Sequence, residues 1–306
     1  MNVSVLVPAH NEAANIRVVL ESLLGQQTSL AKIVEIIVVA SGCTDDTAEI
    51  ARAVARGRPG VHVHVQERRG GKVAAINEYF KIRNPRAEIV VSCSADVHVA
   101  PDVVERIAIC FRDRPEVGMV GTRPVPDNDP RELVGKMVSL LWEMHHRIAE
   151  RQPKMGELVA VRAALIERVS ELSVVDEASF EDIVRSKGFL LAYLGDAIVT
   201  NHGPEHLGEY FEQRRRIARG HYWLDFAFGY QVATLDRSLL LETAYEMARE
   251  EDGFGRAALA AAVVTEVAAR LTGLFEARVL GGKHRTWKPL VSTKRLKQRP
   301  SKGGGT

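Results

Sequence analysis

The residues best suited to chemistry in this sequence follow short apolar runs. The clearest case lies between Glu88 and Pro101, where the run Ile89–Val91 is followed by Asp96 and His98. A short β-rich run bounded by turn residues is typical of a strand buried on both faces of a parallel sheet. Ligands of open α/β sheets bind beyond the carboxyl ends of the strands, so we expect Asp96 to hold a cation or a phosphate-bearing substrate.

Two further polar loops should meet Asp96 at the same edge of the sheet. The apolar runs at residues 3–7 and 34–39 also read as strands, and each is followed by a polar loop. The side chains expected to line one crevice are Asn11, Glu12, Thr44, Asp45, Asp96 and His98. Lys72, at the start of a predicted helix, can meet a phosphate there. The triplet Gly70-Gly71-Lys72 lacks the spacing of a Walker loop, and no Gly-x-Gly-x-x-Gly follows the first run.

The order of the predicted elements provides a sheet to hold these loops. Strands are expected at residues 3–7, 34–39, 61–65, 89–91 and 117–122, with a helical pattern in each interval. This alternation is typical of a parallel sheet with crossover helices, so we predict an α/β fold. After a turn at 124–130, we expect a helix at 133–150, strands at 158–161 and 190–194 with a helix between them, and helix from 205 to 280.

Composition favours a soluble protein of a reducing compartment. The 306 residues suffice for one large α/β domain with a helical appendage, and a hydrophobic content of 46% is ordinary. Three cysteines without a Cys-x-x-Cys pair argue against a disulfide framework. A strand at the very start leaves no room for a signal peptide. The most apolar segment, Ala257–Val264, is far shorter than the roughly 20 residues that span a bilayer. We predict a cytoplasmic protein.

The last part of the chain is strongly basic. From Arg278 to the end there are nine Lys or Arg and no Asp or Glu, and Trp287 lies among them. Such a tail fits an anionic membrane surface, which predicts a peripheral position on the inner face of the cell membrane. A solubilising flexible end is the alternative. No nucleic acid is expected, because a tail with one aromatic residue is a poor match to nucleic-acid binding.

Four segments together resemble the family 2 glycosyltransferases of the GT-A fold, in the family's order and at its spacings. They are residues 7–12 (Val-Pro-Ala-His-Asn-Glu), 41–45 (Ser-Gly-Cys-Thr-Asp), 71–77 (Gly-Lys-Val-Ala-Ala-Ile-Asn) and 94–101, which begins Ser-Ala-Asp. The resemblance covers roughly residues 1–235. It implies a Rossmann-like, mostly parallel sheet with flanking helices, a nucleotide-diphosphate-sugar donor, a divalent cation (Mg²⁺ or Mn²⁺) and inversion at the anomeric carbon.

The resemblance also divides the chain. Residues 1–235 would form the GT-A domain, with a nucleotide-sugar-binding half at about 1–122 and an acceptor and catalytic half at 123–235. Residues 236–280 would be a C-terminal helical extension, and 281–306 a flexible basic tail. The extension includes an apolar helix, Ala257–Leu274, that could serve as a face for a homo-oligomer.

For the donor site, the resemblance implies contacts with the nucleoside from the first two loops and a cation held by the third. The residues carried over for donor binding are Pro8, Ala9, Glu12, Ser41, Lys72, Ser94, Ala95 and Asp96. Asp96 matches the last acid of the family's Asp-x-Asp, which binds metal and diphosphate. The chain departs from the pattern at Ser94, where the first acid is expected, and at Ala40-Ser41, where an Asp-Asp pair is usual. His98 and His202 are the candidate additional ligands, with a cation held largely by the donor's phosphates as the alternative.

For the catalytic base, spacing selects Glu177. In the family an Asp lies eleven residues before the Gly of a Gly-aromatic step, and Gly188-Phe189 places Glu177 there and Asp176 before it. The motif is then reversed, and Glu177 would deprotonate the acceptor hydroxyl. Asp182 is the second candidate. Glu181 and Asp182 are otherwise expected as first-turn acids on a solvated helix face.

An arginine-rich helix resembles the family's Gln-x-x-Arg-Trp element with Ile217 in place of Trp, or the plainer Arg-rich version of non-processive members. Its candidates for binding the diphosphate are Arg215, Arg216 and Arg219, and a solvated basic face is the alternative. Gly156 with Arg162 matches an acceptor-side element more weakly. Adjacent His145 and His146 point about 100° apart on a helix and cannot both chelate, so we expect a face packed through Trp142.

These observations predict a glycosyltransferase of the hexosyl or N-acetylhexosaminyl class acting on an unidentified hydroxyl, in cell-envelope, glycolipid or polysaccharide synthesis. One alternative is a sugar-nucleotide-binding protein with weakened catalysis, because acids are missing at Ala40, Ser41 and Ser94. The other is a nucleotidyltransferase on a similar fold, which would favour a Gly-rich basic loop that residues 8–12 do not provide.

Overall fold

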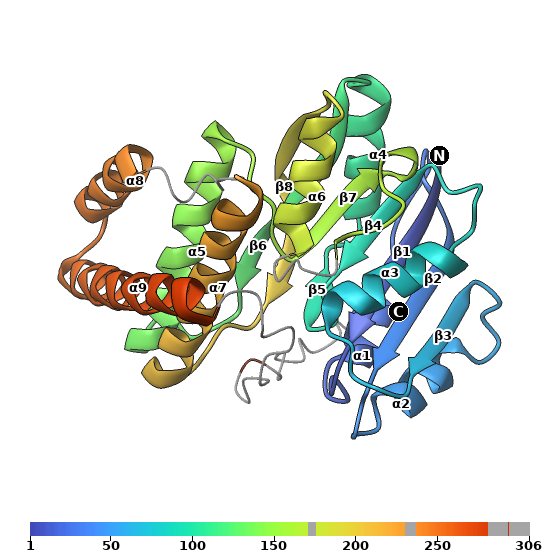
Figure 1. Ribbon diagram of the computed structural model, residues 1–306, viewed down its shortest axis with the longest axis horizontal. Helices are drawn as coiled ribbons and strands as arrows, with labels where there is room; N and C mark the ends of the chain where they lie inside the picture. Colours follow the sequence, from blue (N-terminus) through green and yellow to red (C-terminus); the bar gives the residue numbers. More distant parts are fainter. Residues whose placement is uncertain (171–175, 230–236, 281–292, 294–306) are drawn as a thin grey trace, which may run out of the picture.

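The computed structural model describes residues 1–170, 176–229, 237–280 and Thr293, and it confirms an α/β fold (Figure 1). Within these residues an eight-stranded sheet has the order β3-β2-β1-β4-β7-β6-β8-β5. The strands are β1 Asn2–Ala9, β2 Lys32–Ser41, β3 Val61–Gln66, β4 Ile89–Cys93, β5 Val97–Val99, β6 Val117–Pro126, β7 Leu158–Arg162 and β8 Leu190–Asn201. The α-helices are α1 Ile16–Leu24, α2 Thr47–Ala55, α3 Lys72–Ile82, α4 Val103–Asp113, α5 Leu133–Arg151, α6 Asp176–Ser186, α7 Leu207–Phe228, α8 Arg237–Glu250 and α9 Gly253–Leu280.

The first part of the chain forms the parallel half of the sheet. β1 lies between β2 and β4, β2 continues to β3, and all three pairings are parallel. The chain reaches each next strand through α1, α2 or α3, as the alternation of the sequence predicts. Because later strands lie on both sides of β1, the strand order reverses there. The loops after β1, β2 and β4 therefore open at one edge, where doubly wound sheets bind ligands.

The second half of the sheet is mixed. β7 runs antiparallel to both β4 and β6, and β5 runs antiparallel to β8, whereas β6 and β8 are parallel. The insertion of β7 beside β4 has a consequence for the site. It brings the amino end of β7, at Leu158, opposite the carboxyl end of β4, at Cys93.

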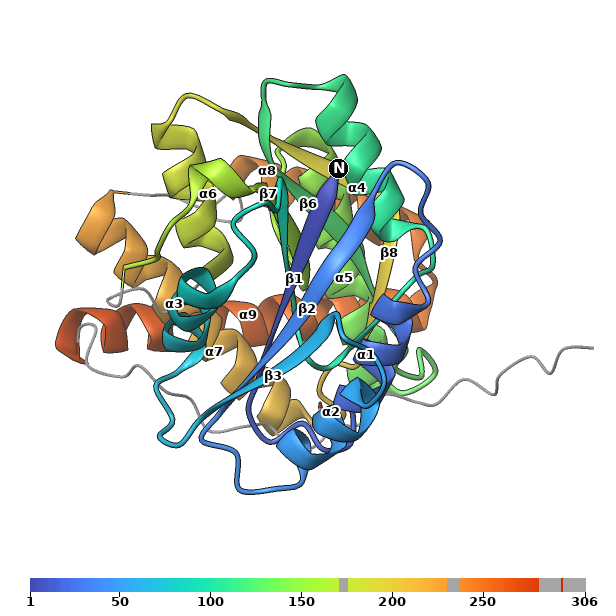
Figure 2. The same ribbon diagram turned by 90° about the vertical axis from the view of Figure 1, so that its right-hand side faces the viewer.

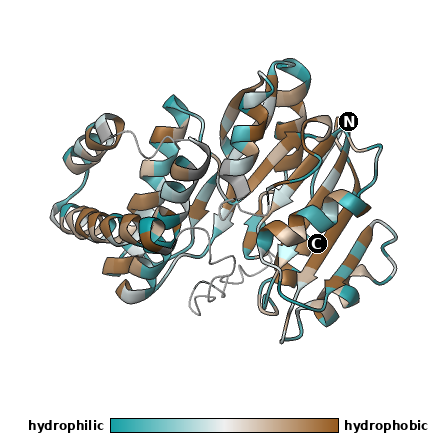
Figure 3. Ribbon diagram, in the orientation of Figure 1, coloured by the Kyte–Doolittle hydropathy of each residue, from teal (hydrophilic) through white to brown (hydrophobic). Residues whose placement is uncertain are grey.

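Buried aliphatic side chains cover both faces of the sheet. One cluster joins the sheet to α1 and α4, through side chains such as Leu20 and Phe111. The other joins the opposite face to α3 and α6, through Tyr79 and Phe180. Figure 2 shows these helices on the two sides of the sheet, and Figure 3 shows hydrophobic residues concentrated along the strands. The buried apolar runs that identified the strands thus form the core of the molecule.

Two segments that were expected to be turn or loop form paired strands in the structure. β6 continues through Pro124 to Pro126 and stays paired with β8 as far as Asn201. Proline has no N–H group to donate to a neighbouring strand. β7 pairs with β6 only as far as Gly121, so the stretch that contains the prolines has no hydrogen bonds to make with β7. β5 is a three-residue strand that fixes the chain just after Asp96 against β8.

The helical part contains a third apolar cluster. The segment from residue 205 onward, expected as continuous helix, contains α7, α8 and α9, and α9 packs along α7 and against α5 (Figure 1). The buried members of the cluster are Met137, Val138, Leu140, Tyr210, Met247, Ala258, Leu259 and Ala262. The α8–α9 segment therefore shares a core with α5 and α7. The predicted domain boundaries at residues 235 and 281 lie outside the residues that the structure describes.

Candidate active site

The loops after β1 and β2 are bound to each other at the carboxyl edge of the sheet. Asn11 has a left-handed backbone with φ of 54°, which Asn tolerates better than most residues. Its side-chain oxygen accepts a hydrogen bond of 2.8 Å from the Thr44 N–H, and its side-chain NH₂ donates to Thr44 Oγ1 at 3.1 Å. The Ala13 N–H donates to Asp45 Oδ2 at 3.1 Å. The two loops therefore form one unit, as their shared edge predicts.

The residues expected along the nucleoside lie in this unit. Pro8 and Ala9 are the last residues of β1, and Ser41 ends β2 with 3% of its surface exposed. Glu12 is also buried; its carboxylate accepts a hydrogen bond of 3.1 Å from the Asn15 side chain. The Glu12 carbonyl accepts the first N–H groups of the α1 turn, so this acid also anchors the start of α1.

The loop before α3 closes on the end of β2. The Gly70 N–H donates to Ser41 Oγ at 3.3 Å. Gly42 has a φ of 56°, and a Cβ there would lie 2.5 Å from the Arg69 backbone nitrogen, so only glycine fits this close approach. Lys72 is the first residue of α3, as predicted. The amino end of α3, with its positive end of the helix dipole, thus opens at this edge.

Three charged groups converge near the end of β4. Burial raises the pKa of the Cys93 thiol; the nearby carboxylates of Asp96 and Glu157 raise it further, and Lys72 acts in the opposite direction. Asp96, Glu157 and Lys72 thus all lie close enough to the Cys93 thiol to act on it electrostatically. Asp96 follows β4 and is half-buried, as predicted for an acid at the sheet edge.

Glu157 is the residue that the sequence interpretation missed. It directly precedes β7, and its carbonyl accepts a hydrogen bond of 3.0 Å from the Ser94 N–H. Its side-chain Oε1 accepts a hydrogen bond of 3.3 Å from Asn201 Nδ2. Asn201 in turn pairs across the sheet with Val97, next to Asp96. An acidic residue at the start of β7 is therefore bonded through its backbone to Ser94, the position at which the family pattern has its first acid.

Asn201 has an oxygen that the described part of the chain leaves without a hydrogen-bond partner. The residue is 6% exposed, and its Oδ1 is buried. A buried amide oxygen without a partner costs free energy, on the order of 1–3 kcal/mol, unless a ligand satisfies it. Asp96, Glu157 and the Asn201 Oδ1 thus offer oxygen ligands of the kind that Mg²⁺ and Mn²⁺ prefer.

The two candidate histidine ligands differ in exposure and in their contacts. His98 is the exposed central residue of β5 and pairs in register with Thr200. His202 is buried, with Nδ1 at 2.5 Å from Asp127 Oδ1 and Nε2 at 3.2 Å from Glu205 Oε1. The hydrogen bond with Asp127 raises the pKa of His202. Ligation of a cation by His202 would require one of these carboxylate contacts to break. In the described ranges no group of three or more His, Cys, Asp or Glu gathers as a metal site.

The α6 helix begins at the predicted acidic segment. Asp176 and Glu177 are its first two residues, and their side chains lie outside the described part of the structure. Glu181 was expected on a solvated face, and that expectation is wrong. It is 4% exposed and accepts a hydrogen bond of 3.2 Å from the Met155 N–H, close to the half-buried Lys154. Asp182 is half-buried.

Comparison with known proteins decides the family. Residues 4–167, more than half of the chain, match the model of glycosyl transferase family 2. The chain belongs to glycosyl transferase family 2. The poly-β-1,6-N-acetyl-D-glucosamine synthase of Staphylococcus aureus strain COL is 25% identical over 229 residues, which cover 71% of this chain and 54% of the synthase. The chain thus spans about half the length of the curated relatives it matches.

Solved glycosyltransferases share the fold. A mannosyltransferase from Pyrobaculum calidifontis, in complex with GDP-mannose and Mn²⁺, superposes with a TM-score of 0.63 at 20% identity, covering 90% of this chain and 87% of its own. Glucosyl-3-phosphoglycerate synthase from Mycobacterium tuberculosis, solved with Mn²⁺ and UDP, has a TM-score of 0.50 at 22% identity, covering 71% and 77%. This family 2 glycosyltransferase therefore has the GT-A architecture expected from its sequence.

The arginine-rich helix of the glycosyltransferase is α7, and part of it packs against α9. Arg215, a candidate for the diphosphate, forms ion pairs with Glu212 and with Glu276 of α9, because α9 packs its acids against this face of α7. Arg216 is half-buried and Arg219 is 6% exposed, so neither belongs to a solvated basic face. Arg215 thus has a structural role in joining α7 to α9.

A neighbouring ion cluster predicts a large effect on stability. Glu266, with 20% of its side chain exposed, accepts hydrogen bonds of 2.7 Å from both Arg214 and Arg270. Burial acts to raise the pKa of Glu266, but the two guanidinium groups lower it to about 2. Its contribution to stability is therefore complete above the ordinary carboxyl pKa of about 4.5 and is lost as the pH falls toward 2.

Glu266→Gln should lower the free energy of unfolding by about 3 kcal/mol at neutral pH, because it leaves two largely covered guanidinium groups without their counter-charge. The matched control is Glu21→Gln, which removes the exposed Arg17–Glu21 pair and should cost less than about 1 kcal/mol. Urea denaturation at pH 7 measures both. Equal losses in the two variants would show that the buried cluster contributes no more than a surface pair.

The remaining predicted positions serve packing. The Arg162 guanidinium donates to the carbonyls of Val117 and Phe111, each at 2.7 Å, so it supports the sheet edge. His145 and His146 point to different partners, as helix geometry predicts: His145 Nε2 contacts the Met155 carbonyl, and His146 Nδ1 contacts the Tyr193 hydroxyl. The His145 ring packs 5.3 Å from the Trp142 ring.

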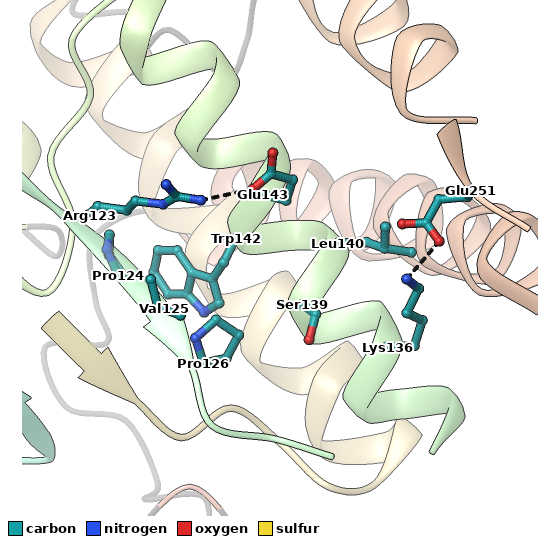
Figure 4. A pocket seen from close by; sticks show the side chains of 10 residues that line it. All are labelled: Arg123, Pro124, Val125, Pro126, Lys136, Ser139, Leu140, Trp142, Glu143 and Glu251. Atoms are coloured by element: carbon teal, nitrogen blue, oxygen red, sulfur yellow. Dashed lines mark hydrogen bonds and ion pairs between the residues drawn. The ribbon is translucent and has the colours of Figure 1, made fainter. Parts of the chain in front are cut away.

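A pocket of about 240 Å³ lies beside the carboxyl end of β6 (Figure 4). The Trp142 indole faces the prolines of β6, and two ion pairs flank it, Arg123–Glu143 at 3.1 Å and Lys136–Glu251 at 2.6 Å. Its lining residues are Arg123, Pro124, Val125, Pro126, Lys136, Ser139, Leu140, Trp142, Glu143 and Glu251. The pocket adjoins the strand end that pairs with Asn201.

Proposed function

We propose that this glycosyltransferase moves a hexosyl or N-acetylhexosaminyl group from a nucleoside-diphosphate-sugar to an acceptor hydroxyl, with inversion at the anomeric carbon. The observation that carries the proposal is the convergence of Asp96, Glu157 and Lys72 at the edge where three sheet loops meet, in a chain of family 2. Opposite charges in this arrangement suit a donor whose diphosphate is bound through both a cation and a lysine. A cytoplasmic reaction on a cell-envelope, glycolipid or polysaccharide acceptor is consistent with the synthase named among the relatives.

The chain's residues fit a divalent cation, Mg²⁺ or Mn²⁺. Asp96 would bind it together with Glu157 and the Asn201 Oδ1, and the buried, unpartnered amide oxygen is the structural support for this set. Glu157 would supply the second negative charge that Ser94 does not. When bound, the cation would stabilise the charge that develops on the departing nucleoside diphosphate.

The other roles belong to the protein itself. Lys72, at the amino end of α3, would bind the diphosphate, and Arg216 and Arg219 remain the candidates for closing over it. Pro8, Ala9, Glu12 and Ser41 would line the nucleoside. Glu177 would accept the proton of the acceptor hydroxyl as the hydroxyl oxygen attacks the anomeric carbon, with Asp182 as the second candidate. The new glycosidic bond forms as the bond from sugar to diphosphate breaks.

One screen tests this function against its alternatives. Purified protein is incubated with UDP-, GDP- and dTDP-sugars and Mn²⁺, and the products are separated by chromatography. A glycosyltransferase releases the nucleoside diphosphate slowly when water accepts the sugar, and faster when an acceptor hydroxyl does. Release of inorganic pyrophosphate from a nucleoside triphosphate and a sugar phosphate would indicate a nucleotidyltransferase instead. Binding of a donor without turnover in every combination would indicate a sugar-nucleotide-binding protein.

The proposed ligand set makes a separate prediction about Glu157. Glu157→Gln keeps the shape of the side chain but removes its charge, so Mn²⁺ affinity should fall by roughly 10- to 100-fold, the range seen when supporting groups of metal sites are lost. Electron paramagnetic resonance of free Mn²⁺ measures the affinity directly. Glu150→Gln is the control, since Glu150 is exposed on α5 and should leave the affinity unchanged. An unchanged affinity in Glu157→Gln would remove Glu157 from the site.

A further inference from the structure

The last described helix, α9, has two chemically different faces. Toward α7 it presents its charged residues: Glu266 bonds with Arg214, and Glu276 pairs with Arg215. Away from α7 it presents large apolar side chains. Their exposed fractions are 69% for Val264, 52% for Val267, 65% for Leu271, 66% for Phe275 and 62% for Val279. The helix thus buries apolar residues such as Leu259 and Ala262 on its inner side, and it carries a second, exposed set of large apolar side chains that an ordinary surface helix would not have.

The exposed residues form one continuous stripe. Their spacing of three or four residues places them along a single side of the helix, and from Val264 to Val279 the stripe is about 22 Å long. The two acids within this stretch, Glu266 and Glu276, are both turned to α7. Figure 1 shows α9 at the margin of the molecule, and it packs against α7. Contiguous apolar surface of this kind on a soluble protein marks a site of interaction.

Charge identifies the kind of surface that this stripe would meet. The sequence that follows the stripe contains nine Lys or Arg from Arg278 onward and no Asp or Glu. A second copy packed with its α9 parallel to the first would bring two such basic segments together, which is electrostatically unfavourable. An anionic bilayer satisfies both features, because its acyl region takes apolar side chains and its headgroups attract Lys and Arg at about 1 kcal/mol each.

The packing of α9 also distinguishes lying on a bilayer from crossing one. By length and composition, Gly253–Val279 is apolar enough to span a membrane, the one such helix among the residues described. Its inner face, however, is bound to α7 through Arg214 and Arg215, and α7 itself continues the domain. A spanning position would carry these ion pairs and α7 into the hydrocarbon, at a high energetic cost.

We infer that the outer face of α9 lies in the surface of an anionic membrane, parallel to it. This contact is independent of the sugar transfer proposed above. It would hold the domain at a membrane surface, where an acceptor carried on a lipid would be within reach.

Co-sedimentation of the full chain with vesicles tests the inference. One set of vesicles contains phosphatidylcholine alone, and the other contains equal parts of phosphatidylcholine and phosphatidylglycerol. The test variant carries Val264→Ser, Leu271→Ser and Phe275→Ser on the stripe. The control carries Leu241→Ser and Tyr245→Ser on α8, which remove side chains that are 72% and 66% exposed beside Glu242 and Glu246. Circular dichroism confirms that both variants are folded.

We expect the wild type and the α8 control to bind the anionic vesicles, and the stripe variant to bind at least about tenfold more weakly, because each buried methylene contributes to membrane affinity. Binding should also weaken as salt rises and be weak on phosphatidylcholine alone. Equal binding by the stripe variant, or no binding by the wild type, would overturn the inference. A dimer in size-exclusion chromatography that the stripe substitutions dissociate would assign the stripe to a second copy and would equally overturn it.

Discussion

Glu177→Gln should lower the rate of sugar transfer by about 10²- to 10⁴-fold, the contribution typical of a general base. The substitution keeps the size and hydrogen-bonding capacity of the side chain but removes its ability to accept a proton. Glu177 is the second residue of α6, and Glu181, one turn later on the same helix, is buried and bonded to the Met155 N–H. The rate with saturating donor and acceptor is the quantity to measure.

Two further measurements make the result specific to a base. Calorimetric titration with the nucleoside diphosphate should give the same affinity for Glu177→Gln as for the wild type, because the base contacts the acceptor and not the donor. Asp182→Asn, one turn further along α6, should retain transfer within a few-fold. A large loss in Asp182→Asn with little loss in Glu177→Gln would reverse the assignment.

Asp96→Ala should reduce transfer by at least about 10³-fold. The carboxylate is the one acid of the family's motif that this chain retains, and it lies with Glu157 and Lys72 around the end of β4. Its loss would weaken the hold on both the cation and the diphosphate, and stabilisation of a developing charge of this kind is worth several kcal/mol. His98→Ala is the control, since His98 is exposed two residues away on β5.

The outcome of the control matters for the ligand set. If carboxylates and the Asn201 amide bind the cation, His98→Ala should change the transfer rate by no more than a few-fold. A loss in His98→Ala as large as that in Asp96→Ala would mean that the imidazole is an essential ligand. The same comparison of transfer rates applies to His202, whose ring nitrogens contact Asp127 and Glu205.

The features predicted correctly from the sequence depend on local pattern. Buried apolar runs gave the strands, and polar residues directly after them gave the edge at which Asn11, Thr44, Asp45 and Asp96 lie. These inferences needed only the period of the pattern and the rule that parallel strands end at one edge. Lys72 at the first position of α3 follows from the same reasoning.

The features that sequence could not provide depend on contacts between distant segments. Glu157 reaches the site because β7 inserts antiparallel beside β4, and no local pattern specifies that pairing. Glu181 is buried because it satisfies a backbone N–H at Met155, 26 residues earlier. Arg215 is engaged because α9, about 60 residues later, packs its acids against α7. In each case the residue type was visible in the sequence, whereas its partner was set by tertiary structure.

The prolines of β6 show a case in which local sequence preference predicts the wrong secondary structure. Pro124 and Pro126 favour a turn when their local preference is considered alone. The structure tolerates them in a strand because β7 ends its pairing with β6 before they begin. A signal was available in the alternation of Arg123 and Val125 with these prolines, but it indicates a strand only once the neighbouring strands are known.

The binding of Mn²⁺ to the wild type and to Asp96→Ala, measured by electron paramagnetic resonance in the presence of UDP or GDP, tests most directly whether Asp96 organises the site. The account predicts one bound Mn²⁺ per chain in the wild type and an affinity at least about 100-fold weaker in Asp96→Ala, with the fold intact by circular dichroism. Equal Mn²⁺ affinity in the two proteins would contradict it.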